Sequence, residues 1–352
     1  MAKTANQDEE FSGTQPVEER NRIDEGKLNA WMAGNVEGYR GPLSILQFRG
    51  GQSNPTYRLD TPTASFVLRR KPFGKLLPSA HAVDREFRVI SMLRQQGFPV
   101  AQPYALCMDD NVIGSAFYVM SMEPGRVLWD PTLPGIAREQ RRAMFVSKIT
   151  TLARLHSYDP HQIGLGDFGR SGNYFARQIE RWTKQYRASE TERIEEVERL
   201  IDWLPMTLPK QERLAIVHGD YRLDNIIFHP TEPTVKAVLD WELSTVGDPM
   251  ADFTYLLMQW SMPGLAKADL GALDIPTMED AARIYGDCTG IELPDLNWYF
   301  SYNLFRLVGI MQGIAGRIRE GTAASAKASE AAALTIPLAQ AAWDFARKAG
   351  AR

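Results

Sequence analysis

The pattern of apolar and polar positions divides the chain into a strand-rich first third and a mainly helical remainder. Short runs of apolar and β-branched residues, bounded by turn residues, predict strands at residues 44–49, 56–60, 65–70, 104–108 and 116–122. One helix interrupts them, because residues 80–96 place apolar side chains at helical spacing and end before Gly97. We therefore expect a small antiparallel sheet accompanied by one helix.

Beyond residue 124, apolar residues recur mainly at helical spacing. The predicted helices cover residues 138–156, 171–204, 250–260, 277–286, 294–320 and 323–349. Three further runs predict strands at residues 214–217, 226–228 and 235–239. Pro230 and Pro233 lie between the last two runs, which favours a hairpin there. The whole pattern is that of an α+β protein.

Two breaks in the pattern suggest how the chain is divided. Residues 1–22 are polar and have no periodicity that could bury a face, so we expect them to be poorly ordered. Pro124 and Gly125 end the last strand of the first third. We therefore place the boundary between two lobes there, with residues 23–124 in the first and 125–352 in the second.

Composition and charge are those of an ordinary soluble enzyme. A chain of 352 residues can bury a large core, and its net charge of -3 argues against a general nucleic-acid binder, which relies on clustered Lys and Arg. Cys107 and Cys288 are too few for a disulfide framework. No secretion signal appears, and the apolar segment 298–318 is interrupted by polar residues. We expect a cytoplasmic protein without nucleic-acid or membrane partners, and the oligomeric state stays open.

Polar residues with metal-binding oxygens stand at the ends of the three later strands. Asp220 follows the first, Asn225 enters the second and Asp240 leaves the third. If these strands lie side by side, two carboxylates and an amide converge, a set that suits Mg²⁺ with waters and substrate phosphates as its remaining ligands. Phosphoryl transfer from a nucleotide needs little else from a protein. Asp220 would then accept the proton of the attacking hydroxyl, while Asn225 and Asp240 hold the metal.

The sequence around these residues resembles that of a known family. His218-x-Asp220 followed by Asn225 has the spacing of the protein-kinase catalytic loop, and Asp240-Trp241-Glu242 stands where kinases carry Asp-Phe-Gly. The stretch is similar to the aminoglycoside phosphotransferase family and, more closely, to the kinase-like region fused to certain acyl-CoA dehydrogenases. This resemblance implies a two-lobed, protein-kinase-like α+β fold, with ATP and Mg²⁺ as cofactors.

The resemblance also implies a nucleotide site in the first lobe. Gly50, Gly51 and Ser53 would contact the phosphates, although two glycines before a polar residue are also typical of a plain hairpin turn. Arg69 stands where kinases have a phosphate-binding Lys, and Glu86 stands where its helical partner is expected; a solvated charged face is the alternative for Glu86. Residues 120–123, including Met120 and Met122, would connect the two lobes and recognise the adenine ring through their backbone groups.

Further residues would support the catalytic loop or form the acceptor pocket. His218 belongs to the loop itself. Asp248 is expected to cap the helix that begins near residue 250 and, by resemblance, to tie the loop in place; Asp252 either does similar work or simply lies in the first helical turn. For the acceptor pocket the candidates are Trp241, Tyr302 and Arg306. Trp241 could equally belong to the core, and Arg306 could be a buried ion-pair partner.

The predicted activity is Mg²⁺-dependent transfer of the γ-phosphate of ATP to a hydroxyl of a small molecule. The helices after Met262 show no dense acidic cluster of the kind that an aminoglycoside acceptor calls for. Similarity to regions fused with acyl-CoA dehydrogenases suggests a hydroxylated acyl-CoA or related metabolite instead. A choline- or homoserine-type kinase and a non-catalytic nucleotide-binding scaffold are the alternatives, and the choice between ATP and GTP stays open.

Overall fold

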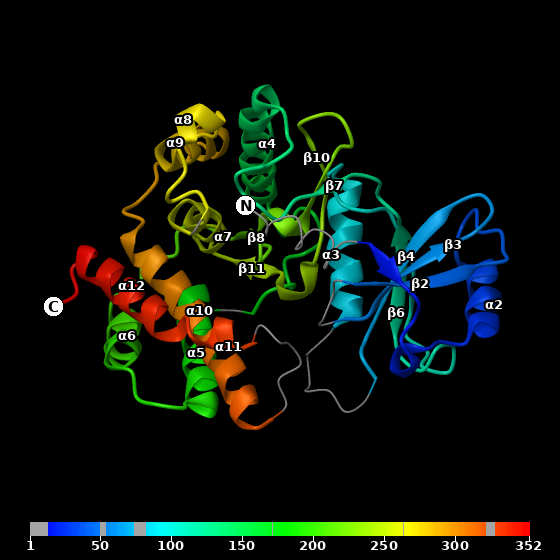
Figure 1. Cartoon of the computed structure of the whole chain (residues 1–352), viewed down its shortest axis with the longest axis horizontal. Helices are drawn as coiled ribbons and strands as arrows, with labels where there is room; N and C mark the ends of the chain where they lie inside the picture. The colour runs from blue at the N-terminus through cyan, green and yellow to red at the C-terminus, as the bar shows by residue number, and fades with distance from the viewer. Residues whose placement is uncertain (1–12, 50–53, 74–81, 171, 263, 322–327) are drawn as a thin grey trace.

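The computed structural model describes residues 13–49, 54–73, 82–170, 172–262, 264–321 and 328–352. It consists of a smaller body built on an antiparallel sheet and a larger, mainly helical body (Figure 1). We call them the N-terminal and C-terminal lobes. The predicted α+β architecture is confirmed. The chain passes from one lobe to the other between strand β6 (Phe117–Ser121) and strand β7 (Arg126–Val127).

The sheet of the N-terminal lobe has six strands in the order β1-β2-β3-β4-β6-β5. Every neighbouring pair is antiparallel. The remaining members of this sheet are β1 (Thr14–Gln15), β2 (Ser44–Phe48), β3 (Thr56–Asp60), β4 (Ser65–Arg70) and β5 (Pro103–Cys107). Helix α2 (Glu25–Asn35) packs on one face of the sheet together with Phe117 and Val119, and helix α3 (Val83–Gln95) packs on the other with Tyr118. This alternation along β6 is what the two-residue period of a strand requires.

The prediction that residues 1–22 are poorly ordered is wrong for the part that the structure describes. Strand β1 pairs with β2, and the short 3-10 helix η1 (Glu19–Asn21) follows it. The side chain of Gln47 accepts a hydrogen bond from the backbone nitrogen of Glu18 (3.2 Å), and the hydroxyl of Tyr57 donates to the carbonyl of Asn21 (2.7 Å). Backbone pairing and polar contacts thus order a segment that has no apolar face. Residues 1–12 lie outside the described part.

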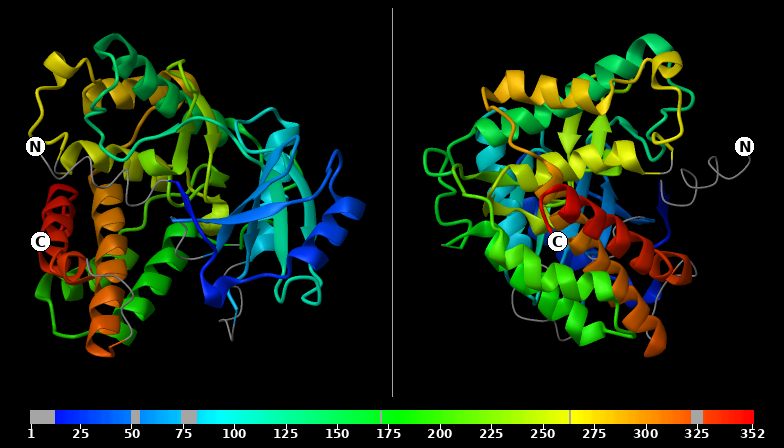
Figure 2. Two further views of the ribbon diagram at one scale, coloured as in Figure 1. Left: turned by 45° about the vertical axis from the view of Figure 1, so that its right-hand side comes forward. Right: turned by 90° about the vertical axis from the view of Figure 1, so that its left-hand side faces the viewer.

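Helices form most of the C-terminal lobe. They are α4 (Arg138–Ser157), α5 (Tyr174–Ser189), α6 (Glu195–Met206), α7 (Met250–Leu257), α8 (Leu270–Leu273), α9 (Met278–Thr289), α10 (Asn297–Arg319), α11 (Ala328–Ala332) and α12 (Thr335–Lys348). Helix α10 lies between α5 and α12 and also contacts α7, which explains why it is buried on nearly all sides (Figure 2). No helix among the described residues is both long and apolar enough to cross a bilayer.

Two small sheets carry the loops between these helices. β9 (Ile226–Phe228) and β10 (Val235–Val238) form the predicted hairpin, and β7 joins its outer side. β8 (Ala215–Val217) pairs instead with β11 (Thr245–Gly247). The prediction of a shared site assumed that these three strands lie side by side. In the structure β9 and β10 belong to one sheet and β8 to another. Strands as short as β7 and β11 leave too little pattern in the sequence to be recognised.

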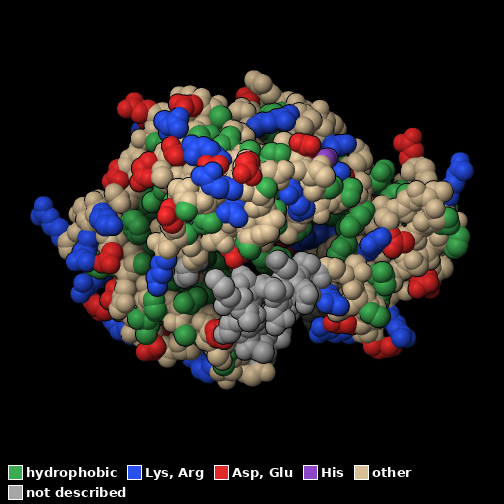
Figure 3. Space-filling model, turned by 45° about the horizontal axis from the view of Figure 1, so that its top comes forward, with side chains coloured by type: hydrophobic (Ala, Val, Ile, Leu, Met, Phe, Trp, Pro, Cys, Tyr) green, Lys and Arg blue, Asp and Glu red, His purple; other side chains and the backbone are tan. Residues whose placement is uncertain are grey.

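The outer surface of the larger lobe carries both signs of charge. On the face shown in Figure 3, acidic and basic side chains are interspersed over this lobe. Charges of both signs in alternation are typical of a solvated surface.

Candidate active site

The catalytic loop runs from the end of β8 to the start of β9, and hydrogen bonds to helix α7 hold it in place. Asp252 on this helix accepts hydrogen bonds from the backbone nitrogens of His218 (2.5 Å) and Gly219 (2.8 Å). Gly219 has a φ of 86°, and a Cβ there would lie 2.9 Å from Leu243, so the loop needs glycine at this position. The expected anchor was Asp248. The carboxylate of Asp248 accepts from the nitrogen of Met250 (2.9 Å) at the start of α7, which is the capping contact expected for it, whereas Asp252 makes the contact with the loop.

Asp220 presents a carboxylate whose two oxygens are held from different sides. Tyr255 donates its hydroxyl to Oδ1 (3.1 Å), and Asn225 donates its amide to Oδ2 (3.0 Å). The guanidinium of Arg222 lies 3.4 Å from Oδ1 and also pairs with Asp224. The side chain of Asp220 remains 23% exposed. A carboxylate that is oriented on both sides and open to solvent can serve as a general base.

His218 connects the loop to the strand that leads to Asp240. Its Nδ1 accepts a hydrogen bond from the backbone nitrogen of Asp220 (3.2 Å), so the ring proton belongs on Nε2, which donates to the carbonyl of Leu239 (2.8 Å). The ring also packs edge-on against Trp241. These contacts give His218 the supporting position expected from the sequence.

The two predicted metal ligands approach each other through a backbone contact. The nitrogen of Leu239 donates to the carbonyl of Asn225 (2.8 Å), which brings Asp240 beside the catalytic loop. Asp240 adopts a left-handed conformation with φ 62° and ψ 66°. Because Asn225 uses its amide nitrogen to bind Asp220, its side-chain oxygen is left as an acceptor. Asn225 and Asp240 thus offer two hard oxygen ligands.

An ion cluster between the lobes surrounds Arg69. Its guanidinium pairs with Glu86 of α3 (3.0 Å), Asp240 (2.6 Å) and Glu242 (3.3 Å). The predicted Arg69–Glu86 pair is therefore present, and the solvated face is the wrong interpretation, because Glu86 is only 1% exposed. Asn54 and Tyr118 donate further hydrogen bonds to Glu86 (3.0 and 3.1 Å).

This cluster carries more negative than positive charge. One guanidinium faces three carboxylates, which leaves two negative charges when Glu86 is ionised and one when it is protonated. Burial raises the pKa of Glu86 to about 7, against the opposing attraction of Arg69. The pKa of Arg69 is also raised, because Glu86 and Asp240 outweigh the effect of its burial. The cluster is thus suited to a divalent cation.

The donor set fits Mg²⁺ with a mixed coordination shell. Among the described residues, no three His, Cys, Asp or Glu side chains form a group that could hold a metal by themselves. Asn225 and Asp240 would supply two oxygens, and water and phosphate would complete the shell. Such partial protein coordination is usual for Mg²⁺ at phosphoryl-transfer sites.

Part of the predicted nucleotide site can be placed and part cannot. Gly50, Gly51 and Ser53 lie outside the described residues. Met120 lies in β6 opposite Val67, and the nitrogen of Met122 donates to the carbonyl of Ser65 (3.4 Å). Both methionines are half-buried at the link between the lobes, and their contact with adenine stays a prediction.

Two of the three acceptor-pocket residues belong to the core instead. Trp241 is 2% exposed, packs against His218 and donates its Nε1 to the carbonyl of Val238 (3.0 Å). Tyr302 is 1% exposed and packs against Phe175. Large aromatic side chains on buried elements are more often core than pocket wall, and here packing prevailed.

Arg306 lies beside the catalytic loop but has no ion-pair partner among the residues that the structure describes. Its Nη2 donates to the carbonyl of Gly219 (2.5 Å). The alternative of a buried ion pair is therefore wrong. The contact joins helix α10 directly to the residue before Asp220.

Sequence reasoning missed several residues that shape the site. These are Asn54, Glu242, Tyr255 and Asp252, the last of which was considered but not chosen. Glu242 had a signal, because it stands two residues after Asp240 in the recognised motif. Tyr255 had only a weak one, its position three residues after Asp252 on the same helix.

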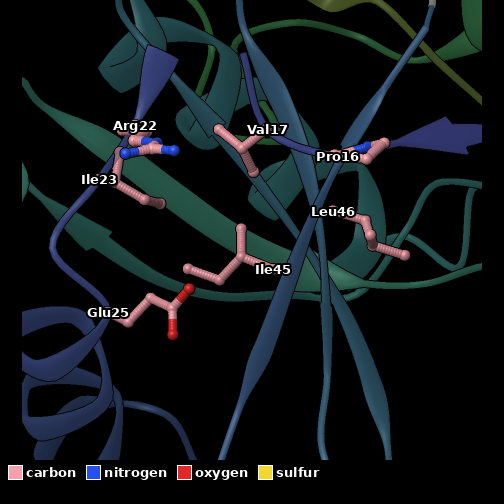
Figure 4. Close-up of a pocket in the computed structure, with 7 residues that line it drawn as sticks. All are labelled: Pro16, Val17, Arg22, Ile23, Glu25, Ile45 and Leu46. Carbon is pink, nitrogen blue, oxygen red and sulfur yellow. The ribbon is translucent and has the colours of Figure 1, made fainter. Parts of the chain in front are cut away.

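A cavity of about 260 Å³ occurs elsewhere, in the N-terminal lobe beside β2 (Figure 4). It is lined by Pro16, Val17, Arg22, Ile23, Glu25, Ile45 and Leu46. None of the residues discussed above contributes to it.

Comparison with known proteins gives relatives over nearly the whole chain. It is 44% identical over 350 residues to acyl-CoA dehydrogenase family member 10 of Mus musculus, covering 96% of this chain but 33% of that protein. It is 39% identical to family member 11 of Gallus gallus, covering 96% of this chain and 45% of that protein. The chain thus spans less than half the length of these curated relatives.

Solved structures agree with the observed fold. A Ralstonia eutropha protein assigned as an aminoglycoside phosphotransferase is 48% identical, with a TM-score of 0.85 over 93% of this chain and 99% of that one. A spectinomycin phosphotransferase, solved with ADP and spectinomycin, has a TM-score of 0.61 at 12% identity, which shows the fold alone. The family model described as "Phosphotransferase enzyme family" matches residues 44–285. The chain is therefore a member of the phosphotransferase enzyme family and has its kinase-like fold.

Proposed function

We propose that this chain transfers the γ-phosphate of ATP to a hydroxyl of a small molecule with Mg²⁺ as cofactor. One observation carries the proposal. Asp220 is oriented by Tyr255 and Asn225, and the backbone contact of Leu239 with Asn225 brings Asp240, whose Oδ1 pairs with Arg69, beside the same loop. The base and the metal ligands are thus assembled around one small volume, which is the requirement of in-line phosphoryl transfer.

Each residue of the site has a defined role in this proposal. Asp220 accepts the proton of the attacking hydroxyl. Asn225 and Asp240 would hold Mg²⁺, which when bound supplies neutralisation of the phosphate charge. Glu86 holds Arg69 within the N-terminal lobe, and Arg69 reaches across to the C-terminal lobe and orients Asp240 through its Nη2. A direct contact of Arg69 or of residues 50–53 with phosphate belongs to the same proposal.

The nucleotide part of the proposal is supported by relatives of the same fold. The spectinomycin phosphotransferase named above binds ADP. The excess negative charge around Arg69 also favours metal-bound nucleotide over nucleotide alone, because bare phosphates would face the carboxylates of Asp240 and Glu242.

For the acceptor we propose a hydroxylated metabolite of the acyl-CoA class. The supporting observation is that the curated relatives bear acyl-CoA dehydrogenase names and extend well beyond the region that this chain matches. Dehydrogenation itself is not proposed for this chain, because its matched region is the phosphotransferase family. A non-catalytic scaffold would not need the two hydrogen bonds that orient Asp220.

A thermal melt tests the nucleotide and metal site. We expect the wild type to be stabilised when ATP and Mg²⁺ are both present, by roughly 2.7 kcal/mol at a ligand concentration a hundred times the dissociation constant. D240N should lose most of this shift, because it removes the negative charge of the one carboxylate among the proposed metal ligands. D220N is the matched control: it should keep the shift and lose the turnover of ATP. No shift of the wild type under any condition would remove the main support for the proposal.

A further inference from the structure

Arg306 is a buried cation that lacks a carboxylate partner among the described residues. It is 8% exposed, and the hydrogen bond that it makes within that part of the chain joins Nη2 to the carbonyl of Gly219 (2.5 Å). A guanidinium has five N–H donors, and buried charges are normally paired. Most of the hydrogen-bonding capacity of Arg306 is therefore available to something outside the described chain.

The charge of Arg306 lies near Asp220, the proposed base. The guanidinium carbon lies 5.0 Å from the ring centre of Tyr255, whose hydroxyl donates to Asp220. Only the side chain of Tyr255 would thus separate an anion bound by Arg306 from Asp220, which accepts the proton. The pKa of Arg306 is raised, because neighbouring phenols and Asp220 outweigh its burial, so the side chain stays charged.

A second buried donor lies next to Arg306. The guanidinium carbon is 5.7 Å from the ring centre of Trp182 on α5. Trp182 is 5% exposed, and its Nε1 has no hydrogen-bond partner in the described structure. Buried donors without acceptors are rare and call for an explanation such as an absent ligand. The unpartnered Nε1 of Trp182 and the positive charge of Arg306 beside it point to the same kind of ligand, a negatively charged acceptor of hydrogen bonds.

Other cations near the loop do not show this feature. Arg222 is largely exposed and is neutralised by Asp220 and Asp224. Arg69 already has three carboxylates. Only Arg306, among these three, offers an uncompensated charge.

We propose that Arg306, with Trp182 beside it, forms an anion-binding subsite for the acceptor, so that the accepted substrates carry a carboxylate or phosphate group close to the reacting hydroxyl. This inference rests on the proposed phosphoryl transfer at Asp220. It also narrows the acceptor class. The carbonyl of a thioester carries no charge, and the phosphates of CoA lie beyond the pantetheine arm, so a free hydroxy acid or a small phosphate ester satisfies Arg306 close to the hydroxyl and an acyl-CoA does not.

Calorimetric titration of matched probes tests the subsite. The protein is first saturated with Mg²⁺ and AMP-PNP, so that the nucleotide site is occupied. The pairs are 3-hydroxybutyrate with 3-hydroxybutyramide, which differ in charge at similar size, and glycerol 3-phosphate with glycerol, which differ by the phosphate group. We expect the wild type to prefer the anionic member of at least one pair by about tenfold, the effect of a charged hydrogen bond. The pair that discriminates tells carboxylate from phosphate recognition.

Two variants and a control complete the test. R306Q keeps an amide donor for the carbonyl of Gly219 but removes the charge, and it should lose the preference. W182F removes the Nε1 donor and should reduce the preference by a smaller factor. R181Q is the control, because Arg181 also lies over the ring of Trp182 but is exposed, and it should retain the preference.

The outcomes separate this inference from the proposed function. A wild type that binds Mg²⁺ and AMP-PNP but shows no anion preference, whether both probes bind alike or neither binds, overturns the subsite alone. An unchanged preference in R306Q does the same. If R306Q does not fold, W182F decides, and an unchanged preference there counts against the subsite. Failure to bind AMP-PNP with Mg²⁺ counts against the proposed function instead.

Discussion

Two buried arginines near the catalytic loop have opposite surroundings. Arg69, at the junction with the N-terminal lobe, contacts the carboxylates of Glu86, Asp240 and Glu242. Arg306, on helix α10, contacts a carbonyl and two aromatic rings and has no ion pair within the described residues. The surroundings of Arg69 thus have too many negative charges and those of Arg306 an uncompensated positive one. The first suits a metal ion, and the second suits an anionic group.

The largest effect expected from this difference concerns stability. R69M should lower the free energy of unfolding by about 3 kcal/mol, because it leaves the buried carboxylate of Glu86 without its cation. The loss lies at the lower end of the usual range, since Asn54 and Tyr118 still donate hydrogen bonds to Glu86. R306M should cost only about 1 kcal/mol, the net value of one hydrogen bond. Urea denaturation of both variants measures the difference.

A double variant provides the control for this comparison. In R69M/E86Q the buried charge is removed together with its partner, so part of the stability lost in R69M should return. Equal losses in R69M and R306M, or no recovery in the double variant, would contradict the view that Arg69 is a charge partner and Arg306 is not.

Local spacing in the sequence was enough to find the chemistry of the site. Asp220, Asn225 and Asp240 stand at strand ends and in a recognised motif, and the structure brings them together at the junction of the lobes. The pairing of Arg69 with Glu86 followed from the resemblance and is present. Such residues can be predicted because their positions are fixed by short loops and by strands that the apolar pattern already marks.

Contacts between distant segments could not be predicted in the same way. Tyr255 reaches Asp220 across 35 positions, and Glu242 reaches Arg69 across 173. Trp241 and Tyr302 were placed in a pocket because an aromatic side chain suits a pocket wall and a core equally well. On a helix such as α10, buried on nearly all sides, periodicity does not tell which face meets the cleft. Only the packing of α5, α7 and α10 around the loop decides this.

Lys148 extends the comparison to a third buried cation. It is 1% exposed on helix α4, and its ammonium donates to the side chain of Gln259. Burial lowers the pKa of Lys148 from 10.5 to about 7. Unlike an arginine, a lysine can lose its proton and so avoid a buried charge. Arg306 cannot lose its proton in this way. The lack of a carboxylate partner for Arg306 among the described residues is therefore the stronger indication of a bound anion.

The pH dependence of stability checks this reading of Lys148. Between pH 7 and pH 10.5 the unfolded state binds more protons at this residue than the folded state, so the free energy of unfolding should rise with pH in that window. From pH 7 to pH 9 the gain should be about 2 kcal/mol. K148M should lack this gain, which appears as the difference between its urea midpoints and those of the wild type. Parallel curves for the two proteins would mean that Lys148 stays charged in the folded state.

The smallest effect concerns Tyr255, which lies between Arg306 and the base. Y255F keeps the ring beside the guanidinium and removes only the hydroxyl that donates to Asp220. We expect kcat for ATP turnover to fall by about tenfold, the value of one hydrogen bond to a charged group, with an unchanged KM for ATP. Y302F is the control, since it also removes a single phenolic hydroxyl, but from a tyrosine that is fully buried in the core against Phe175. An equal loss of kcat in both variants would show that Tyr255 acts through packing. A loss in Y255F alone would show that Tyr255, which lies beside Arg306, also orients the base. The surroundings of both arginines would then contribute to the same reaction.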